Sequence, residues 1–480
     1  MKLRKSVRNS RVSRVSLSRN EGVKEMPQGK LISFRAENYA CFSDEAEISF
    51  QASSSLNDND APTESVSVKE TKIDMLNRLV VLGANASGKT SILRSLQTLL
   101  GMITLEAGSL DYMSTVGFDP FNPFRFCEEQ EEKPTRYEAI FFIKQNDEKE
   151  GNFYRYKISI NKKSGGLLNI VEESLYEVSF VEDVYVDYKK IFNRNIDEGT
   201  TLGDFADNDF NGIVQKLNDM GWWKSLMLIM LAAIGIEPAK LIVNWCKNSS
   251  FFDNDELIMQ EDLNERLSKD KYEWFKEFVE DKSEDSYLSI GQKILGKLDP
   301  SIQNIKFEPI MNNDRIISYD IRTLHSYSPK KGLKTNIEFP MSHESDGTKK
   351  LIYLLPKVLP ILKNGGLFIV DELDAKFHPL LIKYFIQLFS DDTVNVGKAQ
   401  IICSIHNGAL LNFVRADEIC FVQKNDKNKS EIFSLVDYYD SDERLKDKSG
   451  TVITNYNWYL DYLHGRYDGI QKNLLEASGI

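Results

Sequence analysis

Short apolar runs separated by polar turns begin near residue 30 of this chain and predict strands. Residues 31–34 and 46–50 are rich in aromatic and β-branched side chains and flank the segment 38–42, which is typical of a hairpin. The stretch 52–70 is rich in Ser, Asn, Asp and Glu and predicts a mobile loop. Three further runs predict an antiparallel set of strands at 137–144, 153–160 and 168–180.

A different pattern predicts buried strands that lead into helices. Residues 78–82 are largely apolar and run directly into a glycine-rich loop, after which apolar residues recur at helical spacing from Ile92 to Leu100. The apolar runs 367–370 and 400–404 predict two more buried strands. Strands are also expected at 305–307, 316–321 and 335–339.

The stretch from 185 to 304 is helical in pattern and contains many acidic residues, but it lacks the sustained heptads of a coiled coil. We interpret it as a helical insertion. Its most apolar run, Leu226 to Ile236, is too short to span a bilayer and predicts a buried helix. The whole pattern predicts an α/β protein with a mixed β-sheet core, an antiparallel β-subdomain and this insertion.

The distribution of charge distinguishes the N-terminus from the rest of the chain. The chain has 480 residues and a formal charge of -12, which argues against a general nucleic-acid coat. Residues 1–30 contain nine Lys/Arg and two Glu, a net of +7, so the remainder carries -19. This composition is found in organelle transit peptides, but a disordered basic arm or an upstream start codon is favoured. The five cysteines form no C-x-x-C pair, which fits a reduced, cytoplasmic protein without a zinc site.

The loop Gly83–Thr90 reads G-x-x-x-x-G-K-T between a predicted strand and a predicted helix. Glycines allow backbone N–H groups to surround phosphate oxygens at a helix N-terminus. Lys89 is expected to reach the β- and γ-phosphates of ATP, and the Thr90 hydroxyl to ligate Mg²⁺. The candidate nucleotide-binding residues here are Gly83, Asn85, Ala86, Ser87, Gly88, Lys89, Thr90 and Ser91.

Two carboxylates follow the predicted strand 367–370. Asp371, at the end of a buried parallel strand, is placed to ligate Mg²⁺. Glu372 is placed to orient or deprotonate the attacking water, so it is the candidate catalytic base. The strand 400–404 leads into Ser404-Ile405-His406, and His406 is a candidate sensor of the γ-phosphate.

The motif Glu344–Thr348 comes just before a helix expected from Lys349. Ser345, Gly347 and Thr348 can form a second anion site at the N-terminus of that helix, where a plain helix cap is the alternative. One chain cannot easily bring this motif onto its own phosphate loop if both face the same sheet edge. We therefore predict a two-fold dimer in which each copy closes the nucleotide site of its partner. Pro356 and Pro360 are expected to kink the helix.

These motifs together resemble those of the ABC/SMC-like AAA-type ATP-binding proteins of bacterial defence loci. Relatives include the ATPase subunits of the PARIS, Septu and AbiL anti-phage systems and the ATPase half of overcoming-lysogenization-defect nucleases. The resemblance covers most of the chain outside residues 1–30 and the insertion. It is carried by Gly83–Thr90, Glu344–Thr348, Val370–Asp374, His378-Pro379, Ser404–His406 and the segment Tyr462–Tyr467.

The resemblance implies an ABC/SMC-type P-loop ATPase head. By this likeness Ser345–Thr348 are the trans-acting signature, Asp374 belongs to the dimer-facing D-loop and His406 is the switch histidine; the glutamine-loop residue has no counterpart that we can place. Only 74 residues follow His406, too few for a fused nuclease domain as well as the last elements of the ATPase. The implied division is 1–30 basic arm, 31–184 first half of the head, 185–304 insertion and 305–480 second half.

The sequence thus predicts a cytoplasmic ATPase that dimerises through ATP·Mg²⁺, can assemble further, and serves as sensor or scaffold for a separately encoded effector. The resemblance makes that effector a nuclease of Toprim or HNH type, released upon a phage-encoded trigger. One alternative is an SMC-like DNA-repair or chromosome-maintenance ATPase, so direct DNA binding stays open. The other is a self-contained nuclease using Asp440 and Asp442 near Asp437, where a solvated acidic turn is favoured.

Overall fold

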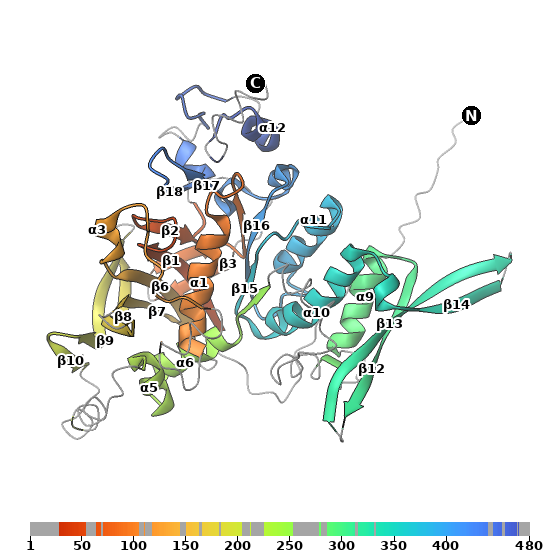
Figure 1. Ribbon diagram of the computed structural model, residues 1–480, viewed down its shortest axis with the longest axis horizontal. Helices are drawn as coiled ribbons and strands as arrows, with labels where there is room; N and C mark the ends of the chain where they lie inside the picture. Colours follow the sequence, from red (N-terminus) through yellow and green to blue (C-terminus); the bar gives the residue numbers. More distant parts are fainter. Residues whose placement is uncertain are drawn as a thin grey trace.

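The computed structural model describes residues 28–53, 64–68, 71–104, 110, 118–144, 150–162, 166–181, 184–203, 212, 225–252, 278–279, 286–312, 315–330, 333–439, 445–453, 457–467 and 469. A six-stranded sheet forms its centre, in the order β11-β15-β16-β5-β17-β18 (Figure 1). Only the β17–β18 pair is antiparallel. The strands are β11 (Ser250–Phe252), β15 (Leu367–Val370), β16 (Gln400–Ile405), β5 (Arg78–Leu82), β17 (Ile419–Lys424) and β18 (Ser430–Ser434).

Every residue of β5, β15 and β16 is buried, as expected for parallel strands that are covered on both faces. Alternate residues of β5 face opposite cores: Leu79 and Val81 join one hydrophobic cluster, and Val80 and Leu82 join the other. Helix α1 (Lys89–Thr104) packs on the first face. Helices α10 (Asp346–Asn364) and α11 (Pro379–Gln387) pack on the second (Figure 1). The predicted α/β class is therefore confirmed.

A seven-stranded antiparallel sheet covers the first core, in the order β10-β9-β8-β7-β6-β1-β2. Its strands are β1 (Gln28–Glu37), β2 (Ala46–Ser49), β6 (Thr135–Lys144), β7 (Asn152–Lys162), β8 (Leu168–Val181), β9 (Val184–Asn195) and β10 (Gly199–Leu202). The predicted hairpin and antiparallel set are confirmed. A short helix, α3 (Glu128–Glu131), precedes β6.

Two predictions about local structure are wrong. The expected loop 52–70 contains β3 (Glu64–Val68), which pairs with β4 (Thr71–Met75). The expected helical insertion begins with strands β9 and β10, which extend the antiparallel sheet. Most side chains of β9 before Ile191 are exposed or half-buried, so the strand lacks the apolar alternation that reveals a core-facing strand. Residues 1–27 of the expected basic arm lie outside the described residues, and 28–30 already belong to β1.

Helices do occur later in the expected insertion: α5 (Met227–Ala233), α6 (Glu237–Lys247) and α9 (Tyr287–Leu298). The buried helix predicted at 226–236 is confirmed by α5. Trp245 of α6 packs edge-on against Phe141 of β6, with ring centroids 5.4 Å apart. Within the described ranges, no single helix is long and apolar enough to cross a membrane; α5 and α6 meet that length and composition only as a pair bent by 105°.

A three-stranded antiparallel sheet extends away from the body (Figure 1). It consists of β12 (Ile302–Asn312), β13 (Arg315–Lys330) and β14 (Leu333–Pro340), which confirms the strands predicted there. The 3-10 helix η2 (Met341–His343) joins it to α10, and α10 continues through Pro356 and Pro360. The remaining elements are η3 (Leu388–Ser390), η4 (Gly408–Phe413), η5 (Ala416–Glu418), η6 (Leu435–Tyr438) and α12 (Trp458–Leu463).

Candidate functional site

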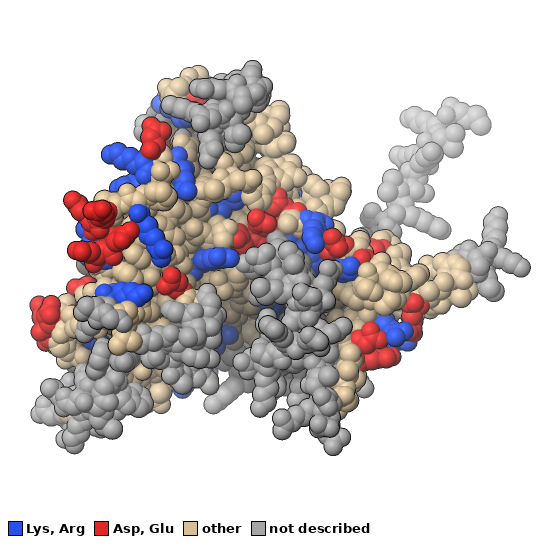
Figure 2. All heavy atoms as spheres, in the orientation of Figure 1, with Lys and Arg blue, Asp and Glu red and all other residues tan. Residues whose placement is uncertain are grey.

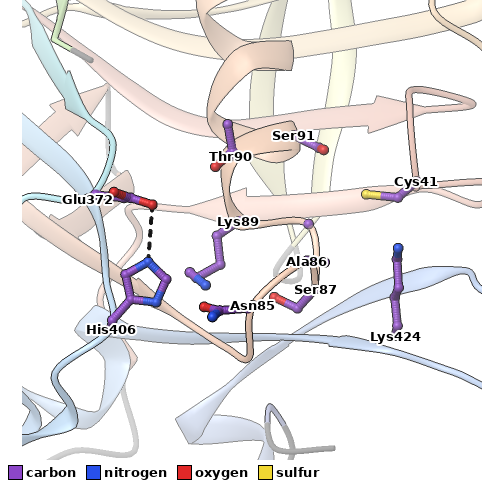
Figure 3. Close-up of a pocket in the computed structure, with 11 residues that line it drawn as sticks. Cys41, Asn85, Ala86, Ser87, Lys89, Thr90, Ser91, Glu372, His406 and Lys424 are labelled. Atoms are coloured by element: carbon purple, nitrogen blue, oxygen red, sulfur yellow. Dashed lines mark hydrogen bonds and ion pairs between the residues drawn. The ribbon is translucent and has the colours of Figure 1, made fainter. Parts of the chain in front are cut away.

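Three segments that are far apart in sequence meet at one edge of the central sheet. Because β15, β16 and β5 are parallel neighbours, the residues that follow them emerge at the same edge. They line a cavity of about 700 Å³ together with Cys41, which lies between β1 and β2, and Lys424, the last residue of β17 (Figure 3). The lining residues are Cys41, Asn85, Ala86, Ser87, Gly88, Lys89, Thr90, Ser91, Glu372, His406 and Lys424.

The loop after β5 has the backbone of a phosphate cradle. Ala86 and Gly88 have φ of 60° and 119°, in the left-handed region that turns successive N–H groups inward. A Cβ at Gly83 would lie 2.3 Å from the carbonyl oxygen of Val422, so only glycine fits where β17 passes the loop. Helix α1 begins at Lys89, and its first N–H groups, which have no partner within the helix, face the same space. The loop is therefore built to bind an anion.

Lys89 brings a positive charge to this cradle. Its Nζ donates to the carbonyl oxygens of Gly83 (2.8 Å) and Ala84 (3.1 Å), within its own loop. Burial lowers the pKa of the Lys89 ammonium, and the carboxylates that follow β15 oppose this shift. A phosphate oxygen is a stronger acceptor for this cation than the loop carbonyls that it now contacts.

Asp371 and Glu372 are joined through one hydroxyl. Ser404 Oγ donates to Asp371 Oδ1 at 2.5 Å and accepts the backbone N–H of Glu372 at 2.7 Å. Ser404 and Asp371 are buried, whereas the side chain of Glu372 is 47% exposed. The two neighbouring carboxylates therefore have different surroundings, one enclosed and one facing the cavity.

Glu372 and His406 face each other at the cavity wall (Figure 3). Glu372 Oε1 lies 3.3 Å from His406 Nε2, and the two side chains come from adjacent strand ends. Glu372 has a φ of 48°, a left-handed conformation that costs a non-glycine residue about 1 kcal/mol or more. The surrounding turn holds this conformation, which directs the carboxylate into the cavity.

Asp374 and Lys350 support this wall from behind. Asp374 Oδ2 accepts the backbone N–H groups of His406 (2.8 Å) and Asn407 (2.6 Å). These two bonds fix the histidine segment, and Asp374 itself does not line the cavity. Lys350, on α10, is fully buried and donates to the carbonyl oxygens of Glu372 (2.9 Å), Leu373 (3.0 Å) and Ala375 (3.0 Å).

The Glu344–Thr348 motif lies outside the cavity. Ser345 is the N-cap of α10, and its Oγ accepts the backbone N–H of Thr348 at 3.1 Å. A Cβ at Gly347 would lie 3.0 Å from the Lys376 carbonyl oxygen, so the motif packs closely on the turn after β15. Glu344 Oε1 contacts His325 Nε2 at 2.7 Å, which ties the motif to the three-stranded sheet. None of Ser345, Gly347 and Thr348 lines the cavity of its own chain.

Several functional positions were missed from the sequence. Cys41 and Lys424 line the cavity on the opposite side of the phosphate loop from Glu372 and His406 (Figure 3). No local signal marks either residue, because each reaches the loop only through the fold. Ser404 was predicted as part of a strand, and its position two residues before His406 could have indicated a role. Lys350 looks in sequence like an ordinary solvated helix lysine.

The oxygen ligands available here fit Mg²⁺. Asp371 offers a carboxylate and Thr90 a hydroxyl, which are the hard donors that this ion prefers. Among the described residues, no three His, Cys, Asp or Glu side chains form a metal cage.

The aspartates of the alternative nuclease site are only partly visible. Asp440 and Asp442 lie outside the described residues. Asp437 Oδ2 accepts the backbone N–H of Ser434 at 2.8 Å and closes a capping box on η6, so it has a structural role.

The central sheet and its phosphate loop define an α/β P-loop ATPase domain. More narrowly, the chain belongs to the family described as "AAA domain, putative AbiEii toxin, Type IV TA system", whose model matches residues 78–187 and 260–412, more than half of the chain. No curated protein matches it.

Solved SMC head domains are distantly similar. The head from Thermotoga maritima is 11% identical over 84% of this chain and 98% of its own, with a TM-score of 0.35. A head bound to the C-winged helix domain of ScpA is 13% identical over 84% and 97%, with a TM-score of 0.38. A head with an extended coiled coil, bound to the C-terminal domain of ScpA derived from Pyrococcus furiosus, is 13% identical over 85% of this chain and 96% of its own, with a TM-score of 0.37. At these scores the likenesses say nothing about activity or partners.

Proposed function

We propose that this protein binds ATP with Mg²⁺ in the 700 Å³ cavity and hydrolyses it between two copies of the chain. One observation carries the proposal. Glu372 and His406 face the phosphate loop across a single cavity, whereas the Ser345 motif of the same chain lies outside it. Among the described residues, the cavity therefore holds a phosphate cradle and a candidate base, whereas the Ser345 motif expected to close the γ-phosphate does not line it.

The geometry supports a simple order of events. The triphosphate occupies the backbone cradle, and the Lys89 ammonium turns from the loop carbonyls to the phosphate oxygens. Glu372 accepts a proton from a water whose oxygen forms a bond to the γ-phosphorus, while the bond to the bridging oxygen of ADP breaks. When bound, Mg²⁺ neutralises the charge that develops on the phosphate oxygens. His406 lies against Glu372 and can register whether the γ-phosphate is present.

The Ser345 motif supplies the missing side from a second copy. Ser345 is exposed at the N-terminus of a 19-residue helix, where a hydroxyl and backbone N–H groups favour an anion. A two-fold axis that brings this helix onto the partner's phosphate loop forms two equal sites at once. The dimer is then held by two triphosphates and loosened by their hydrolysis.

The assignment of the base can be tested directly. Glu372→Gln should bind ATP normally but release phosphate at least about a hundredfold more slowly, because the amide cannot accept the water's proton. Lys89→Ala should fail to bind ATP. Equilibrium binding of a fluorescent ATP analogue and steady-state phosphate release distinguish these results. Normal hydrolysis by Glu372→Gln would show that another group is the base.

A mixing experiment tests the trans arrangement. Lys89→Ala and Ser345→Arg should each be inactive alone, the second because the bulky cation blocks the anion site. Mixed dimers contain one site with both Lys89 and Ser345 intact, so mixing should restore roughly a quarter of the wild-type rate. If mixing restores nothing although mixed dimers form, or if Ser345→Arg alone is active, the site does not lie between subunits.

We further propose that this ATPase is a cytoplasmic sensor or scaffold of a bacterial anti-phage system that controls a separately encoded effector, such as a nuclease. The family description, which names a putative toxin of a toxin–antitoxin system, supports a role in a system of several components. Co-purification with the product of the adjacent gene, with and without ATP, tests this role. The proposal is contradicted if the protein does not protect its host from phage and does not co-purify with the product of the adjacent gene.

A further inference from the structure

The chain from Asn457 to Tyr467, together with Gly469, packs against the phosphate loop and the segment that follows His406. We refer to these residues as the C-terminal bridge. They contact the site at two places: the phosphate loop itself and the 3-10 helix η4, which begins two residues after His406.

The first contact holds the backbone of the phosphate loop. The Gly469 carbonyl oxygen accepts the N–H of Ala84 at 2.9 Å, and the Gly469 N–H donates to Gln423 Oε1 at 2.8 Å. Gly469 has a φ of 99°, and a Cβ there would lie 3.2 Å from the ring of Tyr462. Because Lys89 also donates to the Gly83 carbonyl oxygen, which belongs to the same peptide unit as the Ala84 N–H, a shift of this peptide would move the lysine's anchor.

The second contact holds the segment that follows His406. Helix α12 packs on η4, where a Cβ on Gly408 would lie 2.9 Å from the ring of Tyr459. Asn412 Nδ2 donates to Asn457 Oδ1 at 3.2 Å. The backbone of His406 and η4 therefore cannot shift far without displacing α12.

The two contacts belong to one packed unit. Phe421 of β17 stacks on Tyr462 (centroids 5.5 Å apart, interplanar angle 7°) and on Tyr467 (5.8 Å, 19°). The Tyr462 hydroxyl donates to the Gly469 carbonyl oxygen at 3.3 Å, and Tyr467 is fully buried. Stacked aromatic side chains with few rotatable bonds transmit a displacement instead of absorbing it.

We propose that the C-terminal bridge is a positioning element of the ATPase: through Gly469 it sets the phosphate loop, and through α12 it sets the histidine segment, so that both are held in fixed relation. The proposal rests on the ATPase function proposed above. It predicts two separable effects. Loosening the Gly469 end should weaken ATP binding, whereas loosening the Tyr459 end should slow hydrolysis of bound ATP.

Matched substitutions in the full chain separate the two ends. Gly469→Ala should raise the Kd for ATP about fivefold, the effect of losing one hydrogen bond, while kcat at saturating ATP changes little. Gly450→Ala is its control, because Gly450 also has a left-handed φ of 87° but nothing within 4 Å. Tyr459→Ala should lower kcat about fivefold with an unchanged Kd, because the ring that packs against Gly408 and positions the histidine segment is lost. Tyr459→Phe, which keeps the ring against Gly408, should behave as wild type.

Thermal melting of each variant checks that the fold is intact. If Gly469→Ala does not fold, Gln423→Met removes the acceptor of the Gly469 N–H and should give the same rise in Kd. The proposal is overturned if folded Gly469→Ala or Gln423→Met binds ATP as Gly450→Ala does, or if Tyr459→Ala keeps the wild-type kcat. Failure of wild-type protein to bind or hydrolyse ATP would instead count against the ATPase function itself.

Discussion

Single hydroxyl and ammonium groups decide how the carboxylates of this site are held. Ser404 lies in β16, the strand between β15 and β5, and contacts both Asp371 and Glu372. Lys350 reaches the same turn from α10 and satisfies three carbonyl oxygens at once. The sequence predicts Asp371 and Glu372 because they end an apolar run, but it cannot predict Lys350, whose role exists only once the turn has folded against α10.

Lys350 should give hydrolysis a dependence on pH. Burial lowers the pKa of its ammonium to about 8 from the ordinary 10.5. Above pH 8 the neutral amine has only two N–H groups for three carbonyls, so we expect kcat to fall between pH 7 and 9.5. Lys350→Met should be slow throughout and should lack this fall, because methionine has no proton to lose at that position. Steady-state phosphate release at each pH measures the effect.

Stability should change in the opposite direction. The folded chain loses this proton at a lower pH than the unfolded chain, so the unfolded state binds more protons between pH 8 and 10.5. Unfolding free energy of wild type, relative to Lys350→Met, should therefore rise with pH in that window. A relative stability that falls there, in urea titrations at pH 8 and 10, would contradict the assignment.

At the scale of elements, the sequence predicts those that carry a periodic apolar pattern. Strands β5, β15 and β16 are continuous apolar runs, and α1 shows helical spacing. Strands β3 and β9 were missed because pairing with a neighbouring strand stabilises them, while much of their side-chain surface stays exposed. Backbone pairing of this kind leaves little trace in hydrophobic pattern.

The docking of α5 on the antiparallel sheet depends on one carboxylate. Glu173 of β8 is fully buried and accepts the N–H groups of Met227 (2.8 Å) and Leu228 (3.0 Å) at the start of α5. Its Oε2 also lies 3.5 Å from Nη1 of the buried Arg194. Burial raises the pKa of Glu173, and Arg194 opposes that shift.

Removing this carboxylate should destabilise the fold substantially. Glu173→Ala leaves two helix N–H groups without their acceptor and removes the carboxylate that faces the buried Arg194 guanidinium, so we expect a loss of about 3–5 kcal/mol in unfolding free energy. The neighbouring Glu172→Ala, at an exposed position, should change it by less than about 0.5 kcal/mol. Urea denaturation followed by circular dichroism measures both. Equal effects of the two substitutions would mean that Glu173 does not anchor α5.

At the scale of the whole molecule, the sequence predicts the class of fold and the order of the motifs, but not how they lie together. Residues 83–90 and 371–372 are separated by nearly 300 positions in the sequence. They meet because they follow β5 and β15, which flank β16, the strand that leads into His406. Strand order depends on the packing of two cores on one sheet, which no local pattern records. The cavity residues Cys41 and Lys424 could not be predicted for the same reason.

Charge at this scale argues against a DNA-binding head. The chain beyond residue 30 carries a net charge of -19, and on the face shown in Figure 2 basic and acidic side chains are interspersed. We expect a variant without residues 1–27 to show no binding of duplex DNA at physiological salt, because binding requires a surplus of cations to displace condensed counterions. Fluorescence anisotropy across a salt series, with the full chain for comparison, tests this. Salt-dependent binding by the shortened chain would favour the SMC-like alternative.

The position of helix α10 affects how the rate of ATP hydrolysis depends on ATP concentration. Its N-terminus carries Ser345, and five residues later Lys350 holds the turn that contains Glu372 of the same chain. In the proposed dimer, the N-terminus of each α10 therefore contacts the nucleotide of the partner. Lys350, on the side of the same helix, contacts the turn that contains Glu372 of its own chain. Binding of ATP at one site then changes the position of Glu372 in the other site. Hydrolysis should depend on ATP concentration sigmoidally, with a Hill coefficient above one that falls to one in the mixed dimers with a single intact site.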